Sequence, residues 1–326
     1  MEYLSLCYHY IRTPKQEERF PNILGISISE FEKQLKKLKV KFNFLSLNDL
    51  IDIYYLKKHI KIKKPGLLLT FDDGLSDHYE AAKILFEQNI SAVFFVPSCI
   101  LKDNLPANPN IIHYTIAKFG IKKFLDIYEC ALQKMDFTSK KYMIKYNKSS
   151  DDPWTTIKKI KIMFKYKFEN DDSRKILLYI YKNLLEKKFP NILKNMHLTS
   201  SQLKKMVKMN HNIGTHTHSH ISIKGSNLTK NEFQNEVIYP KYFYKKQFNI
   251  DADSFSYPFG EKNDVLSVKN LLKKTKEYKF AFTVEEKINT ELTSTFDIGR
   301  YQPTSEDNTQ RLIKTLDGIL NGSHNN

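Results

Sequence analysis

Residues 67–74 read Leu-Leu-Leu-Thr-Phe-Asp-Asp-Gly and give the strongest indication of the fold. Its apolar run is typical of a strand buried on both faces, and the glycine allows a sharp turn where the strand ends. Ligands and catalytic groups collect at the carboxyl ends of strands in parallel α/β sheets and barrels. Asp72 and Asp73 stand at such an end, where two carboxylates are costly to bury unless a cation or hydrogen-bond donors receive them. The alternative is a helix start, with an aspartate as the cap of a helix expected at residues 77–88.

Strand and helix patterns alternate on both sides of this stretch. A strand is expected at residues 2–10, residues 79–86 have helical periodicity, and residues 91–96 form a second apolar run. The chain therefore contains a strand–helix–strand unit of the parallel, right-handed kind. The alternation returns after residue 200, and a last strand is expected near residues 296–300. The pattern predicts an α/β fold.

The rhythm changes between about residues 101 and 200, where long helical patterns rich in Lys and Tyr replace the strand signals. We interpret this segment as a mostly helical insertion that covers the substrate cleft. The predicted organisation is one domain over residues 1–326, interrupted by the insertion at about 101–200.

Composition narrows the class of protein. Of the 326 residues, 41% are hydrophobic, which excludes global disorder. No secretory signal is visible, no apolar stretch approaches the ~18–20 residues of a membrane span, and three distant cysteines make no disulfide framework. These features predict a reducing, cytoplasmic setting. The net charge of +16 fits nucleic acid, an anionic membrane surface or an anionic substrate, but also a general bias toward lysine, because the excess is not confined to one face or arm.

A second informative stretch, residues 212–220, reads Asn-Ile-Gly-Thr-His-Thr-His-Ser-His. His216 and His220 are four residues apart and can face one point, whereas His218 would point away from it. Two imidazoles and one carboxylate form a familiar set for a zinc-type ion with open positions for water and substrate. The alternative is an exposed histidine-rich loop.

The aspartate pair of the first stretch and the histidine pair of the second have complementary chemistry. A metal needs a carboxylate ligand and a hydrolytic reaction needs a base, so adjacent aspartates can divide these tasks. Two like charges this close repel each other, and a divalent ion beside them relieves the repulsion.

Three motifs in this order resemble the polysaccharide deacetylase family, the NodB-homology enzymes of carbohydrate esterase family 4. They are Thr-Phe-Asp-Asp-Gly at residues 70–74, His-Thr-x-Ser-His at 216–220 and Ser-Tyr-Pro-Phe-Gly at 256–260. The resemblance runs from residue 3 to about residue 300, interrupted by the insertion. It implies a distorted (β/α)-barrel.

The resemblance also implies roles for individual residues. Asp72 matches the general base of the family, and Asp73, His216 and His220 match its metal ligands. A groove-lining segment with an oxyanion-binding backbone N–H is matched by Tyr257, Pro258 and Phe259.

The sequence departs from the family pattern in two places. Ser256 stands where the family has an arginine that contacts the base, and we expect Arg300 to replace that arginine from the last strand. The late Leu-x-His motif, which supplies the general acid, is absent. A circularly permuted branch of the family supplies this histidine from a Tyr-His pair on the first strand, and Tyr8-His9 fits that pattern. We therefore assign His9 as the general acid; the alternative is a buried histidine satisfied by backbone groups.

The predicted function is that of a metal-dependent hydrolase. It would remove an N-acyl group, expected to be N-acetyl, from an amino sugar of a surface glycan or of its lipid- or nucleotide-linked precursor. One divalent ion is implied, Zn²⁺ first, with Co²⁺ or Ni²⁺ as alternatives. We expect no nucleic-acid partner, and peripheral contact with the inner membrane leaflet would suit the charge. The alternatives are an inactive metal- and carbohydrate-binding protein, a nucleic-acid-binding protein and a non-haem iron oxygenase.

Overall fold

The computed structural model describes residues 1–137, 139–147 and 151–322 of the chain. Within these ranges eight strands form one sheet in the order β10-β1-β5-β6-β7-β8-β9, with β4 pairing to β5 beside this path. Its pairings are parallel except for the short one between β1 and β10. The strands of this sheet are β1 (Glu2–Tyr8), β4 (Asn43–Leu45), β5 (Gly66–Phe71), β6 (Val93–Val96), β7 (Asn212–Thr215), β8 (Ser254–Ser256), β9 (Phe280–Phe282) and β10 (Asn289–Thr290). A separate parallel pair joins β2 (Ile11–Arg12) to β3 (Ile26–Ser27).

The predicted central strand is β5, and every one of its residues is buried. It pairs with β1 along its whole length, while β4 pairs with its first half and β6 with its last residues. Apolar side chains therefore cover both of its faces, as the unbroken apolar run predicted.

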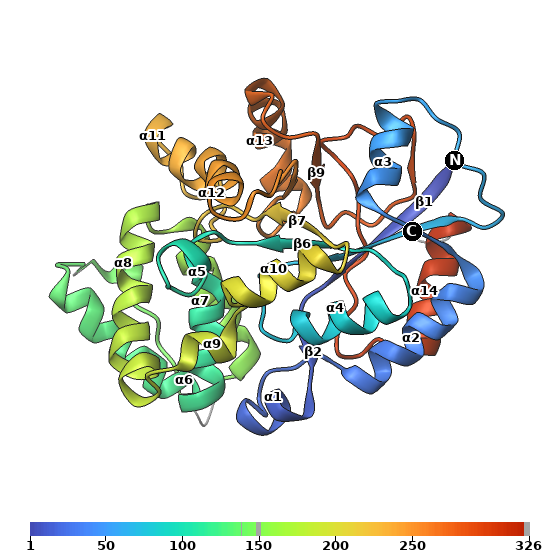
Figure 1. Ribbon diagram of the computed structural model, residues 1–326. Helices are drawn as coiled ribbons and strands as arrows, with labels where there is room; N and C mark the ends of the chain where they lie inside the picture. The colour runs from blue at the N-terminus through green and yellow to red at the C-terminus, as the bar shows by residue number, and fades with distance from the viewer. Residues whose placement is uncertain (138, 148–150, 323–326) are drawn as a thin grey trace.

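Helices lie on both sides of the sheet (Figure 1). They are α1 (Pro14–Arg19), α2 (Ile28–Lys41), α3 (Leu47–Tyr54), α4 (His78–Glu87), α5 (Cys99–Lys102), α6 (Asn108–Lys134), α7 (Pro153–Tyr166), α8 (Asn170–Ile180), α9 (Ile192–Met196), α10 (Ser200–Lys208), α11 (Lys230–Phe233), α12 (Tyr239–Phe248), α13 (Lys262–Thr275) and α14 (Thr309–Leu320). A 3₁₀ turn, η1 (Lys140–Tyr142), and two π-helical stretches, η2 (Tyr181–Glu186) and η3 (Gln234–Ile238), complete the set for the described residues. Phe31 of α2, Leu85 of α4 and Leu312 of α14 share one apolar core with Leu67 and Leu69 of β5.

The prediction of a last strand near residues 296–300 is wrong, because no regular strand forms there. This segment forms only isolated bridges, from Ile298 to Phe282 of β9 and from Tyr301 to Leu6 of β1. The ladder is interrupted because the side chain of Asn289 takes both backbone groups of Gly299, accepting from its N–H and donating to its C=O. The segment nevertheless bridges β9 and β1, which lie near opposite ends of the strand order.

Residues 101–200 are mostly helical, as predicted, and they build an apolar core of their own. Ile111 and Phe124 of α6 pack there with Ile160 of α7 and Leu177 of α8. In Figure 1 the helices α6 to α9, drawn in green, gather at one side of the sheet, away from α2 and α14. Helix α6 is interrupted at Gly120, whose φ of 78° is not helical.

The observed arrangement is the α/β class predicted from the sequence, with a curled, largely parallel sheet and a high helical content. None of the helices in the described ranges is both long and apolar enough to cross a membrane.

Candidate active site

The Asp pair lies at the carboxyl end of β5, and both side chains are buried. Gly74 turns the chain with a φ of 57°, and a Cβ there would come within 2.7 Å of Val96 Cγ1, so no other residue fits. The helix-cap alternative is wrong for this pair. The residue at the N-cap of α4 is Asp77, which makes no capping hydrogen bond and pairs with Arg12 at 3.2 Å instead.

One oxygen of Asp73 faces two imidazoles. Its Oδ1 lies 3.1 Å from His220 Nε2 and 3.6 Å from His216 Nε2, and all three residues are buried. This Oδ1 is buried without a hydrogen-bond partner among the described residues. A carboxylate oxygen and two imidazole nitrogens within 4.8 Å of one another are a donor set that suits a divalent ion. The residues present therefore fit the predicted metal site.

Hydrogen bonds behind this cluster fix the direction of its donor atoms. His216 Nδ1 donates to the backbone oxygen of Ser256 at 2.8 Å, which leaves the Nε2 lone pair facing Asp73. Asn110 of α6 donates to Asp73 Oδ2 at 3.3 Å and so leaves Oδ1 for the histidines. No sequence motif singled out Asn110, because it lies in the helical insertion.

The loop after β7 is held by a buried carboxylate. Glu236 of η3 accepts from the backbone N–H groups of His218 and Ser219 and from the Ser219 hydroxyl, at 2.7–3.1 Å. Thr217 Oγ1 accepts from the N–H of His220 at 3.0 Å. These bonds stabilise a strained backbone, since Thr217 and His220 both have positive φ, at 56° and 61°.

Asp72 forms a two-point salt bridge with Arg300. The guanidinium donates from Nη1 to Oδ1 and from Nη2 to Oδ2, both at 2.8 Å, and Ser256 Oγ donates to Oδ2 at 2.9 Å. Arg300 thus reaches the carboxylate from the bridging segment, and Ser256 lies against both partners because Arg300 Nη2 also donates to its Oγ. Burial favours the neutral acid, but Arg300 and His216 outweigh it and hold the pKa of Asp72 below its usual range.

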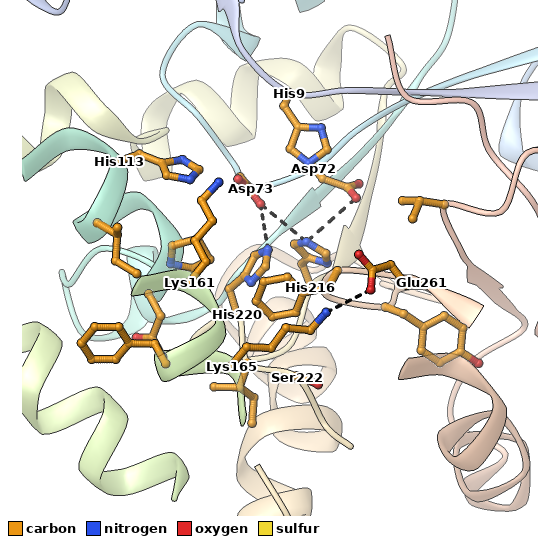
Figure 2. A pocket seen from close by; sticks show the side chains of 18 of the residues that line it. His9, Asp72, Asp73, His113, Lys161, Lys165, His216, His220, Ser222 and Glu261 are labelled. Atoms are coloured by element: carbon orange, nitrogen blue, oxygen red, sulfur yellow. Dashed lines mark hydrogen bonds and ion pairs between the residues drawn. The ribbon is translucent and has the colours of Figure 1, made fainter. Parts of the chain in front are cut away.

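His9 lies just past β1 on the other side of the Asp pair from the two metal-facing histidines (Figure 2). A ring nitrogen of His9 lies within 4.8 Å of an Asp72 oxygen and of the Cys7 sulfur. Burial raises the pKa of the Cys7 thiol, so Cys7 is a neutral neighbour and not an anionic ligand. The backbone oxygen of His9 accepts from His78 Nε2 at 2.8 Å, which fixes the chain at this point.

A cleft of about 410 Å³ opens above these groups, a size typical of small-molecule sites. Its lining includes His9, both aspartates, both metal-facing histidines, Tyr257 and Phe259. Pro258 is buried behind the wall and is not part of the lining. Phe259 has a φ of 66°, its ring lies edge-on to His220, and no hydrogen bond among the described residues uses its N–H.

The insertion supplies side chains that sequence patterns did not single out. His113 of α6 lines the cleft and pairs through Nδ1 with the Tyr10 hydroxyl at 3.0 Å; burial and, to a smaller extent, the nearby Lys161 lower the pKa of His113 to about 3. Lys161 and Lys165 of α7 line the same cleft. No motif marks these residues, because their position depends on how the insertion folds over the sheet.

The remaining histidines lie outside the metal-facing cluster. His218 turns away, as predicted, and contacts Ser98 Oγ and Asp103 Oδ2 at 2.7 and 2.8 Å. His197 and His211 are buried against the backbone oxygens of Gly74 and Ala82.

Comparisons with known proteins agree with the sequence motifs. The family model described as "Polysaccharide deacetylase" matches residues 155–280, which contain the His-Thr-x-Ser-His and Ser-Tyr-Pro-Phe-Gly stretches. A search among curated proteins found no match.

Solved structures share the fold at low sequence identity. The Streptococcus pyogenes deacetylase PplD in complex with acetate is 18% identical, with a TM-score of 0.56 over 97% of this chain and 98% of that one. IcaB from Ammonifex degensii is 16% identical, with a TM-score of 0.56 over 96% of both chains. A de-N-acetylase from Aggregatibacter actinomycetemcomitans is 17% identical, with a TM-score of 0.54 over 96% of this chain and 99% of that one.

These likenesses confirm the predicted class, a (β/α)-barrel of the deacetylase type in which the parallel sheet is curled into a half-barrel. The circular permutation inferred from Tyr8-His9 stays a prediction. The chain resembles the polysaccharide deacetylase family in its ordered motifs, in its family-model match and in its fold.

Proposed function

We propose that this protein is a metal-dependent N-deacetylase that hydrolyses the N-acyl group of an amino sugar, in a surface glycan or in its lipid- or nucleotide-linked precursor. One observation carries the proposal: Asp73, His216 and His220 converge at the floor of a cleft, with Asp72 and His9 beside them. This arrangement would provide a metal site, a base and an acid for one reacting bond. The cytoplasmic setting expected from the sequence belongs to this proposal.

The metal would be held by Asp73 Oδ1 and the Nε2 atoms of His216 and His220. When bound, a divalent ion such as Zn²⁺ would polarise the acyl carbonyl and lower the pKa of a water molecule. The hydrogen bonds from His216 to the Ser256 carbonyl and from Asn110 to Asp73 would keep the three donor atoms turned toward that position.

Asp72 would act as the base. Its pairing with Arg300 keeps the carboxylate ionised across the neutral pH range, which is the form that accepts a proton. The same two bonds and the Ser256 hydroxyl fix its orientation, so that little reorganisation is needed when the attacking water loses its proton.

His9 would protonate the departing nitrogen. Amide cleavage stalls if the amine leaves as an anion, so an acid is needed on the leaving-group side. His9 lines the cleft opposite the metal-facing histidines, and its main chain is held by His78. The N–H of Phe259 would donate to the oxyanion of the tetrahedral intermediate.

The alternative of an inactive carbohydrate-binding protein was favoured by the missing arginine of the third motif. That argument loses its weight, since Arg300 contacts Asp72 through both guanidinium nitrogens from a different segment.

The proposal is tested by measuring acetate release from N-acetylated amino sugars presented as oligosaccharide, sugar nucleotide and lipid-linked sugar. Metal-loaded protein is expected to release acetate and a free amine from at least one of them, with equal rates in the absence of oxygen. Turnover that requires oxygen would identify an oxygenase instead, and no release from any of the three would overturn the proposal.

A further inference from the structure

A second cavity, of about 770 Å³, adjoins the catalytic cleft. The two share three lining residues, Tyr10, His113 and Lys161, so the cavities lie side by side and these residues mark their boundary. The second cavity is built mainly by α6 and by the start of α7 (153–161), with one wall from residues 21–24.

The lining of this second cavity is mainly apolar. Its aliphatic and aromatic members include Ile23, Leu24, Ile116, Phe119, Trp154 and Ile157. Trp154 and Leu24 are 65% and 57% exposed, although large apolar side chains gain free energy when they are removed from water. Of the polar side chains in the wall apart from Lys161, the Asn22 amide already donates to the Ala117 carbonyl, and Tyr10 and His113 bond each other. Lys122 is exposed at the surface, and Tyr146 packs against the apolar core of the insertion. A sugar would leave its hydroxyls without partners there, whereas a hydrocarbon chain would not.

The boundary between the two cavities carries a positive charge. Lys161 makes no hydrogen bond or ion pair with any described residue, and in Figure 2 its side chain extends toward His113 and Asp73. Lys165, one turn further along α7, is different because Asp264 at 2.8 Å and Glu261 at 3.5 Å neutralise it. Asp73 attracts this ammonium without forming an ion pair with it, so the ammonium is suited to a phosphate group on the ligand.

We propose that the substrate is an N-acylated amino sugar joined through a phosphate to an apolar chain. The sugar occupies the catalytic cleft, Lys161 binds the phosphate, and the chain lies in the second cavity against Trp154. This inference rests on the proposed deacetylase function for the sugar portion. From the catalytic cleft to the second cavity the lining is first polar, then cationic at Lys161, then apolar. This order matches the sugar, the phosphate and the hydrocarbon chain of the proposed substrate.

Trp154 is the single tryptophan of the chain, so its fluorescence reports on the second cavity without any turnover. We would titrate the full-length protein with decyl phosphate, decyl glucoside and inorganic phosphate, each below micelle-forming concentrations. Decyl phosphate is expected to shift the Trp154 emission to shorter wavelength and to bind about tenfold or more tighter than decyl glucoside. Inorganic phosphate is expected to leave the emission unchanged, because it has no chain to reach Trp154.

Two variants of α7 sharpen the test. Lys161→Gln is expected to abolish the preference for decyl phosphate over decyl glucoside. Lys159→Gln removes the same charge from an exposed position of α7 outside both cavities, and it should keep the preference. Equal affinities of the wild-type protein for the two decyl ligands, or an effect of Lys159→Gln as large as that of Lys161→Gln, would overturn the inference.

Turnover separates this inference from the proposed function. The wild-type protein should deacetylate a decyl phosphodiester of N-acetylglucosamine with a kcat/KM about tenfold or more above that of decyl N-acetylglucosaminide. Equal kcat/KM values, or faster turnover of a neutral oligosaccharide or a sugar nucleotide, would overturn the inference and leave the deacetylase function standing. Phosphate-dependent binding at Trp154 without acetate release would support the inference on ligand class and contradict the proposed function.

Discussion

At the scale of single residues, the site depends on how charges are paired. Asp72 and Arg300 are buried together, and among the described residues neither has another partner of opposite charge at salt-bridge distance apart from His216, which lies 3.9 Å from Asp72. Removing one partner of such a pair leaves an uncompensated buried charge, which costs far more than the pair contributes when it is intact.

Arg300→Gln should therefore destabilise the protein by about 3–5 kcal/mol. It should also raise the pKa of Asp72, because burial would no longer be opposed by the guanidinium. Since the base must be ionised, the acidic limb of the kcat/KM profile should move to higher pH. Urea unfolding and a pH–rate profile measure the two effects. Arg300→Lys keeps the charge but not the two parallel bonds and should lie in between; an acidic limb that stays in place in Arg300→Gln would contradict the assignment.

His211 offers a pH test far from the reaction. Its Nε2–H donates to the Ala82 carbonyl and its Nδ1 accepts from the Ala92 N–H, so the fold binds the neutral ring. Burial lowers the pKa of His211, and burial also lowers those of His78 and His197 to about 4. Below the histidine pKa of about 6.5 in the unfolded chain, the unfolded chain therefore binds protons that the folded chain does not bind.

Stability should accordingly be highest above pH 6.5 and fall as the pH drops toward 4, by up to about 1.4 kcal/mol per pH unit for each such histidine. His211→Gln cannot take up the proton, so its unfolding free energy should be lower at pH 7 but less steep in pH than that of the wild-type protein. Urea unfolding between pH 7 and pH 4.5 measures both slopes. An equal pH dependence of the unfolding free energy in the two proteins would show that His211 does not contribute to the loss of stability at low pH.

At the scale of elements, the loop after β7 is the part that positions the two proposed histidine ligands of the metal. It carries His216 and His220 in a backbone held by Glu236, which lies in the π-helical stretch η3. π-Helical turns are often found at functional sites, because they shift the side chains of a helix out of their regular register.

Glu236→Ala should leave two buried N–H groups and a hydroxyl without an acceptor. The expected cost is about 1–3 kcal/mol for each unsatisfied donor, together with a metal affinity lower by about 10- to 100-fold. Metal titration followed by calorimetry measures the affinity. Glu236→Gln keeps an acceptor oxygen in nearly the same place and should weaken binding much less; equal losses in both variants would show that the carboxylate does not hold this loop.

The position of each site residue relative to the strands and helices determines whether the sequence could predict it. The Asp pair and the His pair follow directly on strands, so their local patterns predicted both their burial and their convergence. Arg300 was expected on a regular strand and instead arrives on a bridging segment, since Asn289 takes the backbone groups of Gly299. Asn110 and Lys161 could not be predicted, because nothing in a helical pattern tells which turn of an insertion will meet the sheet.

At the scale of the whole molecule, the metal cluster joins parts of the chain that are distant in sequence. Asp73 follows β5, the histidines follow β7, and Asn110 comes from α6 in the insertion. A ligand that binds only the folded state stabilises that state, by about 2.7 kcal/mol at a concentration 100 times its dissociation constant.

Zn²⁺ should therefore raise the thermal midpoint of chelator-treated protein. His216→Gln and His220→Gln each remove one donor atom and should abolish most of the increase. His218→Gln changes the neighbouring histidine, which contacts Ser98 and Asp103 instead of the cluster, and should retain it. An increase that persists in the first two variants would place the metal elsewhere.

The proposed reaction is hydrolysis of an N-acyl sugar in one cleft, with Asp72 as base and His9 as acid. The most direct measurement is the rate of acetate release by metal-loaded wild-type protein, Asp72→Asn and His9→Gln, with metal content verified in each. Each variant should be slower by on the order of 10²–10⁴ while its metal content is unchanged. Acetate release at the wild-type rate by either variant, or none by the wild-type protein, would contradict the account.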